Sequence, residues 1–333
     1  MCPAHGKCRY GKCQKISAHF RDHLSPCWRK TTYGASVINN KIQAWIQASR
    51  IHFFVATFIP LLIGWFLAIQ EYGQSHPLRF LLVLSGSLIV HLITNLANDY
   101  FEYNTGTDAG EAIGGSRVIQ EGKIAPQTML KVIIVLYAIA FAIALIIIFN
   151  FRLYLLSIPI LFAAFSSLFY VAPPIRYGYH GLGELFVGIN MGPIMVIGTY
   201  WVIAGHPGWV PFFVSLPVGL MVALILYYQS LPDMITDYRA HKFTLAVRLG
   251  KKGAYRLLLL FFLVIYLSIF LLIISGLLSW WSFSFLLSLP LIIKLTAIIK
   301  RTENWVLLDQ HGKYVRMIYF ICGLAIIAGI LLR

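Results

Sequence analysis

The 333-residue chain is 59% hydrophobic, only 12% charged and has a formal net charge of +15. Charged residues make up about a quarter of ordinary soluble domains, so this composition excludes a soluble globular protein. Blocks of about 18 or more apolar residues predict membrane spans, because about 20 helical residues cross the ~30 Å hydrocarbon core of a bilayer. We expect an all-α integral membrane protein with about nine transmembrane helices, at residues 51–70, 80–98, 128–149, 153–172, 184–205, 211–231, 254–276, 279–298 and 314–332.

The distribution of lysine and arginine predicts the orientation of these spans, since both accumulate on the cytoplasmic side of a membrane. A cytoplasmic N-terminus leaves Arg79, Arg152 and Arg333 outside and places the other 24 of the 27 Lys and Arg residues inside. We therefore expect a protein of the cell (inner) membrane with a cytoplasmic N-terminus. The same bias accounts for the net charge, so the charge does not indicate a nucleic-acid partner.

Residues 1–40 are expected to form a basic cytoplasmic extension that precedes a membrane domain at 41–333. Four thiols with histidines nearby could bind Zn²⁺ or an iron–sulfur cluster. These thiols belong to Cys2, Cys8, Cys13 and Cys27. Their spacings of 6, 5 and 14 residues match no standard metal framework. The sequence favours a basic tail against anionic lipid and leaves a metal site as the alternative.

A polar motif, 91-HLITNLANDYFEYNTGTDAG-110, overlaps the end of the second predicted span. Helical spacing of three and four residues places four polar side chains on one face. They are Asn95, Asn98, Asp99 and Glu102. Asp108 follows Gly106, where the chain can turn. The motif therefore presents a row of carboxylate and amide oxygens at a helix end.

A second motif, 229-QSLPDMITDY-238, follows the sixth predicted span and puts Asp233 and Asp237 one helical turn apart. In the predicted topology eight of the twelve acidic residues lie on the cytoplasmic side: Asp99, Glu102, Asp108, Glu111, Glu121, Glu184, Asp233 and Asp237. Two facing groups of carboxylates repel each other, and oxygen ligands without Cys or His suit Mg²⁺. Polar helix ends that reach water are the alternative. The equivalent position of both motifs favours a site between two four-helix pseudo-repeats, with the ninth span added.

Basic residues follow both motifs, which predicts that an anion binds beside the metal. Arg117 and Lys123 come after the first motif, and Arg239, Lys242 and Arg248 come after the second. Arginine and lysine bind phosphate oxygens, so carboxylates and bases together indicate a diphosphate site. The cytoplasmic bias of Lys and Arg alone would also place basic residues here. Among the candidates for binding the diphosphate we rank Arg117 and Lys123 first.

These motifs resemble those of the UbiA superfamily of intramembrane aromatic prenyltransferases. The family's Asn-Asp-x-x-Asp motif with a further Asp, and its Asp-x-x-x-Asp motif, are matched by Asn98, Asp99, Glu102 and Asp108 and by Asp233 and Asp237. The resemblance covers residues 41–333. The strings at 170–188 and 233–250 are most similar to the 1,4-dihydroxy-2-naphthoate branch, which forms menaquinone.

The resemblance implies a funnel of helices, open to lipid, in which both motifs cap a central cavity. Mg²⁺ held by the six motif residues would bind the diphosphate of a polyprenyl donor, and ionisation would give an allylic cation that an aromatic acceptor attacks. The implied catalytic residues are Asp99, Asp233 and Tyr170, the last resembling the family's Tyr-basic motif. The implied diphosphate-binding residues are Arg117, Lys123, Arg176 and Lys242, and the implied pocket residues are Asn95, Glu184 and Gln229. We expect polyprenyl diphosphate, the acceptor and the bilayer as partners, with no obligate protein partner.

Four residues depart from the family pattern. Glu102 replaces an Asp and is longer by one methylene. Gln229 and Ser230 stand where the naphthoate branch usually has Asn-Asn, and Pro232 stands where that branch often has Arg. Other acceptors therefore stay open: 4-hydroxybenzoate, homogentisate, a tetrapyrrole or a glycerol lipid. An ion-coupled transporter is the alternative of another class, although it needs charges deep within the spans rather than at their ends.

Overall fold

The computed structural model describes residues 41–107 and 115–333, and the part that it describes is helical and turn structure without strands. The cysteine-containing extension and Asp108 lie outside these residues. The compact unit is Ala44–Arg333. Its elements are η1 (Ile51–Phe53), α2 (Val55–Tyr72), α3 (Pro77–Thr105), α4 (Pro126–Asn150), η2 (Tyr154–Leu156), α5 (Ser157–Phe169), η3 (Tyr177–His180), α6 (Gly183–Ile189), η4 (Asn190–Ile194), α7 (Met195–Ala204), α8 (Trp209–Ser230), α9 (Met234–Arg239), α10 (Leu245–Ile274), η5 (Trp280–Ser288), α11 (Leu289–Arg301), η6 (Trp305–His311) and α12 (Gly312–Leu331).

Eight helical segments of the described chain are long and apolar enough to cross a membrane. They are α2, α3, α4, Gly183–Ala204, α8, α10, Trp280–Arg301 and Trp305–Leu331. The fourth predicted span, 153–172, corresponds to a shorter apolar helix at Tyr154–Phe169, which ends ahead of Pro173 and Pro174, and proline cannot continue a helix. The protein is a multi-pass membrane protein, while the count of nine and the orientation stay predictions.

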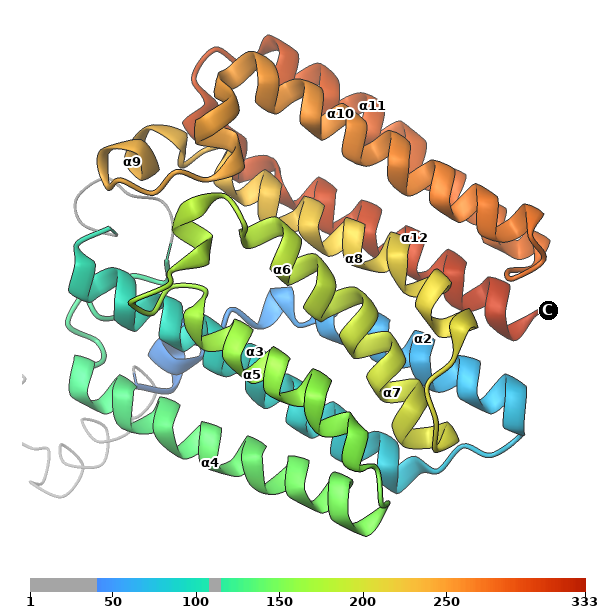
Figure 1. Ribbon diagram of the computed structural model, residues 1–333. Helices are drawn as coiled ribbons and strands as arrows, with labels where there is room; N and C mark the ends of the chain where they lie inside the picture. The colour runs from blue at the N-terminus through green and yellow to red at the C-terminus, as the bar shows by residue number, and fades with distance from the viewer. Residues whose placement is uncertain (1–40, 108–114) are drawn as a thin grey trace, which may run out of the picture. The chain divides into compact units, whose positions relative to one another are not determined.

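α8 is the centre of the bundle, and 61% of its most apolar window is buried, the largest share among the eight spans. Figure 1 shows α10 and α11 side by side beyond α8 and α12, and α4 at the opposite side of the bundle beyond α3 and α5. α3 packs on α4, and α2 packs between α7 and α12. This arrangement buries the aliphatic faces of α2, α8 and α12 in one continuous hydrophobic core.

The two motif-bearing helices end differently. α3 continues through the first motif as far as Thr105 and ends at Gly106, whose left-handed φ of 74° turns the chain as expected. The second motif is not one continuous helix, since α8 ends at Ser230 and Asp233 becomes the N-cap of the short helix α9. Pro232 explains this break, because proline lacks the backbone donor that a continuing helix needs. Asp233 and Asp237 nevertheless remain one turn apart, and the Asp237 N–H donates to the Asp233 carbonyl at 2.8 Å.

Candidate active site

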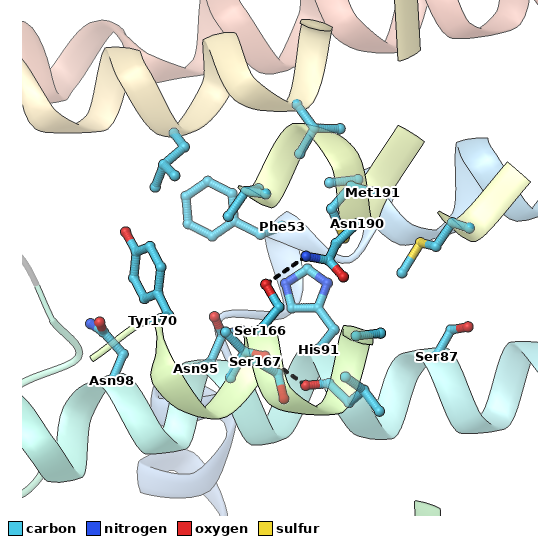
Figure 2. A pocket seen from close by; sticks show the side chains of 18 of the residues that line it. Phe53, Ser87, His91, Asn95, Asn98, Ser166, Ser167, Tyr170, Asn190 and Met191 are labelled. Carbon is cyan, nitrogen blue, oxygen red and sulfur yellow. Dashed lines mark hydrogen bonds between the residues drawn. The ribbon is translucent and has the colours of Figure 1, made fainter. Parts of the chain in front are cut away.

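A cavity of about 1020 Å³ extends along the helices from the two carboxylate motifs. On α3 its lining runs from Leu82 to Glu102, which is about 30 Å of helix at 1.5 Å per residue. Figure 2 shows Asn98 and Tyr170 at one end of the cavity and Ser87 toward the other. Nine of the predicted site residues line it: Asn95, Asn98, Glu102, Tyr170, Glu184, Gln229, Asp233, Asp237 and Lys242. The structure thus brings the cores of both motifs to one cavity.

Lys242 joins the two motifs. Its Nζ lies 2.8 Å from Glu102 Oε1 and 3.5 Å from Asp237 Oδ1. Burial disfavours the charged form of Lys242, but the neighbouring carboxylates of Glu102 and Asp237 outweigh it and raise the pKa of the lysine well above its usual value. Asn98 Nδ2 donates to the other Glu102 oxygen at 2.9 Å. The glutamate that departs from the family pattern is therefore held at the centre of the site.

Asp237 shows how crowded the carboxylates are. Burial, opposed by Lys242 and reinforced by the nearby Asp233 and Glu102, raises the pKa of Asp237 to about 7. A carboxyl with this pKa is only partly ionised at neutral pH unless another cation approaches. The site therefore has more negative charge than Lys242 neutralises.

The donor set fits a hard divalent cation. Asn98, Glu102, Asp233 and Asp237 all line the cavity with oxygen donors, and Asn98 Oδ1 is buried with no hydrogen-bond partner among the described residues. Buried amide oxygens are rarely left unsatisfied, so this atom indicates a missing partner. No group of three or more His, Cys, Asp or Glu side chains is already clustered as a metal site in the described ranges. A cation here would need substrate oxygens as well, which is typical of Mg²⁺.

Asp99 differs from the other motif carboxylates because it does not line the cavity. Its Oδ1 forms a 2.5 Å ion pair with Arg50 Nη2 and accepts the Ser116 N–H at 3.0 Å, and its Oδ2 accepts the Ser116 hydroxyl. Gln47 Nε2 donates to the Ser116 carbonyl at 2.7 Å. Asp99 thus ties the segment before η1 and the segment after the first motif to α3.

Three of the predicted diphosphate-binding residues, Arg117, Lys123 and Arg176, also lie outside the cavity lining. Lys123 pairs with Glu121 at 2.6 Å, and the Arg176 guanidinium lies 5.9 Å from the centre of the Tyr179 ring. Their roles as phosphate ligands stay predictions, and only Lys242 of the predicted set lines the cavity.

Tyr170 points into the cavity close to Asn98 (Figure 2). Burial raises the pKa of its phenol, although Lys242 opposes the rise, so the hydroxyl stays protonated. A Cβ at Gly183 would lie 3.2 Å from the Tyr170 ring, and one at Gly178 would lie 2.9 Å from the Tyr170 carbonyl. The Gly-Leu-Gly-Glu string therefore leaves room for Tyr170 beside Glu184.

A group of polar side chains crosses the otherwise apolar middle of the cavity, and the sequence motifs did not predict it. His91 Nδ1 lies 2.6 Å from the Thr57 hydroxyl, and Asn190 Nδ2 donates to Ser166 Oγ at 2.7 Å, as Figure 2 shows. Asn190 begins the π-helical turn Asn190–Ile194, a feature found frequently at functional sites. Only the mixture of Asn, Gly and Pro inside an apolar block could have signalled it.

Two residues at the edge of the cavity were also missed, Arg50 and Arg316. Each is one basic residue in a basic segment beside a predicted span, so the inside bias hides it. Only the packing of the helices shows that Arg50 and Arg316 reach the cavity.

The sequence profile of the UbiA prenyltransferase family matches residues 57–306 of the chain. Two bacterial proteins named 1,4-dihydroxy-2-naphthoate octaprenyltransferase are each 31% identical to it. The Bacillus subtilis (strain 168) protein aligns over 245 residues, which is 73% of this chain and 78% of the relative. The Escherichia coli (strain K12) protein aligns over 275 residues, which is 79% of this chain and 86% of the relative.

Solved structures share the fold. Digeranylgeranylglyceryl phosphate synthase superposes with a TM-score of 0.59 at 19% identity and covers 88% of this chain and 99% of its own. A UbiA homolog from Archaeoglobus fulgidus bound to GPP and Mg²⁺ superposes with a TM-score of 0.53 at 15% identity and covers 86% and 99%. At these identities the likeness concerns the fold alone.

Proposed function

The chain belongs to the UbiA prenyltransferase family, and we propose that this prenyltransferase moves a polyprenyl group from its diphosphate to 1,4-dihydroxy-2-naphthoate with Mg²⁺. The observation that carries the proposal is the meeting of Glu102 and Asp237 at Lys242, at one end of a long apolar cavity. Family membership identifies an enzyme and disfavours the transporter alternative. We also propose the inner membrane as its location, with the motifs on the cytoplasmic side.

Asn98, Glu102, Asp233 and Asp237 supply the oxygens that would hold Mg²⁺, and bound Mg²⁺ supplies positive charge to the diphosphate. A UbiA homolog from A. fulgidus is bound to GPP and Mg²⁺, which supports a prenyl diphosphate and Mg²⁺ as the ligands we propose for this protein. The Lys242 ammonium then donates hydrogen bonds both to the motif carboxylates and to the phosphate oxygens. Charge that develops on the leaving diphosphate is stabilised by such fixed cations.

In the proposed reaction the bond between C1 of the donor and the diphosphate oxygen breaks, and diphosphate leaves with both electrons. The acceptor ring carbon forms the new bond to C1, and the ring regains aromaticity by losing CO₂ or a proton. Tyr170 faces this end of the cavity with a protonated phenol ring, and aromatic faces stabilise cations. The apolar lining on α3, α4 and α5 excludes water that would otherwise capture the allylic cation.

The deciding experiment incubates the purified protein in lipid nanodiscs with Mg²⁺, a polyprenyl diphosphate and a panel of aromatic acceptors, and identifies products by mass. We expect diphosphate and a prenylated dihydroxynaphthalene product in equal amounts, with or without the carboxylate according to whether CO₂ or a proton is lost. Asp237→Asn should reduce turnover by at least about a hundredfold, since one motif carboxylate loses its charge. Glu303→Gln, an exposed carboxylate outside the cavity, is the matched control. Prenylation of another acceptor in place of the naphthoate would overturn the acceptor assignment, and wild-type turnover in Asp237→Asn would overturn the site.

A further inference from the structure

Among the residues that the structure describes, three Lys or Arg side chains line the cavity: Arg50, Lys242 and Arg316. Arg50 pairs with Asp99, and Lys242 pairs with Glu102 and Asp237. Arg316 has no carboxylate within 4 Å in the part of the chain that the structure describes. A cation near the end of a membrane helix that faces a cavity and has no carboxylate in direct contact is a candidate functional group.

Arg316 is held in a fixed place. It lies one turn into α12, is half-buried, and its guanidinium lies 5.4 Å from the centre of the Phe53 ring. α12 is joined to α2 by a hydrogen bond of 3.2 Å from the Tyr319 hydroxyl to the Ala56 carbonyl. A hydrogen bond of 2.8 Å from the Tyr228 hydroxyl to the Leu308 carbonyl holds the preceding segment η6. The backbone segments on either side of Arg316 are therefore held in place.

The residues around Arg316 form an edge of the cavity between η1 and α12, here called the Arg316 mouth. It consists of His52, Phe53, Asp309, Gly312 and Arg316. His52 and Asp309 are exposed, so the mouth reaches the surface of the described unit. Asp309 is the charged side chain that acts on Arg316, at a distance beyond 4 Å, whereas Asp237 interacts with Lys242, Asp233 and Glu102. Arg316 is thus not among the groups that dominate the pKa of Asp237 at the diphosphate end.

This geometry selects the kind of anion that Arg316 would bind. The diphosphate has its own site at the two motifs, so a second phosphate group is not needed at the mouth. A planar guanidinium binds a carboxylate through two parallel hydrogen bonds. The acceptor proposed above is a planar ring with one carboxylate, and it must reach the cavity from water rather than from lipid.

We propose that Arg316 captures the carboxylate of the incoming aromatic acceptor at the Arg316 mouth and so selects carboxylated rings. Phe53, which points into the cavity (Figure 2), orients the guanidinium and leads the ring inward. The inference rests on the proposed function, since it names how that function's acceptor is recognised. Arg316 acts before the transfer step, so its effect belongs to KM rather than kcat.

The test compares two acceptors that differ only in the carboxylate: 1,4-dihydroxy-2-naphthoate and 1,4-dihydroxynaphthalene. In Arg316→Gln we expect the KM for the carboxylated acceptor to rise about tenfold, while kcat, the KM for the diol and the KM for the polyprenyl diphosphate stay within twofold. The tenfold rise should shrink at high salt, because an exposed charge pair is screened. In Arg316→Lys the KM for the carboxylated acceptor should lie between the values of Arg316→Gln and wild type.

Lys313→Gln is the matched control, because Lys313 is exposed on the same helix and its loss changes the net charge equally. Turnover of the diol shows that each variant is folded. Equal KM changes for both acceptors, or an effect of Lys313→Gln as large as that of Arg316→Gln, would overturn the inference. A wild-type protein that prenylates no acceptor would instead overturn the proposed function. Calorimetric binding of 1,4-dihydroxy-2-naphthoate to wild type and Arg316→Gln then still decides the role of Arg316: equal affinities overturn it.

Discussion

Lys242 lies between carboxylates from two motifs that are more than a hundred residues apart in sequence. Its Nζ contacts Glu102 and Asp237, whose side chains are nearly inaccessible to solvent. Removing one partner of a buried ion pair leaves the other charge uncompensated, which costs about 3–5 kcal/mol. The residue is therefore expected to support both the fold of the site and its chemistry.

We predict that Lys242→Met lowers the free energy of unfolding by about 3 kcal/mol and kcat by at least a hundredfold, since one fixed cation is lost from the leaving group. Thermal unfolding and product formation in nanodiscs measure the two effects. Lys252→Met, which removes an exposed lysine of α10, should leave both near wild type. A Lys242→Met protein with normal kcat would contradict the assignment of this lysine to the reaction.

Single residues also show what the sequence could and could not predict about the site. The polar row on α3 was expected, and Asn95, Asn98 and Glu102 do line the cavity. Asp99 was expected beside them, but its side chain is turned to Arg50 and Ser116. Helical spacing predicts which residues share a face, but not which neighbour covers the edge of that face.

Glycines allow α6 and η4 to pack closely against α8. A Cβ at Gly219 would lie 2.5 Å from the Gly188 carbonyl, and one at Gly192 would lie 2.6 Å from the Gly219 Cα. Small residues allow this close approach of backbones in membranes. The contact also places the π-helical turn that carries Asn190 against the central helix.

We predict that Gly219→Ala destabilises the protein by about 2 kcal/mol, because the new methyl group meets backbone atoms that no side-chain rotation can move. Gly198→Ala is the matched control, since a Cβ there meets no atom within 4 Å and alanine favours the helix. Thermal unfolding in the same detergent compares both variants with wild type. A Gly219→Ala protein as stable as the Gly198→Ala protein would contradict the close packing.

At the level of elements, hydropathy predicted where the helices are. Prolines explain one helix that is shorter than predicted and one motif that is interrupted. The predicted block 153–172 is a shorter helix that ends at Phe169, and the second motif is divided at Pro232. Hydropathy averages over a window and does not detect one missing backbone donor. The arrangement of the helices around α8 depends on contacts between distant segments, which a pattern along one chain does not contain.

The cavity relates the whole molecule to the bilayer. Its lining includes Phe141, Leu145 and Leu161, apolar side chains on α4 and α5 that are also exposed on the surface of the unit. An apolar opening at this level would let a long polyprenyl chain extend from the site into lipid. The opening lies far from the motifs, since Ala144 is 18 residues from the start of α4, about 27 Å along the helix.

We predict that Ala144→Trp discriminates between donors by length, because the bulky ring narrows the cavity where only a long chain reaches. The KM for octaprenyl diphosphate should rise about tenfold, while the KM for dimethylallyl diphosphate stays within twofold. Leu259→Trp adds the same ring on α10, at an exposed site that does not line the cavity, and should change neither value. The product assay with both donors provides the measurement. Equal changes in the KM for the two donors would contradict this path for the tail. A ring in the path of the tail must weaken the binding of the long donor more than that of the short one.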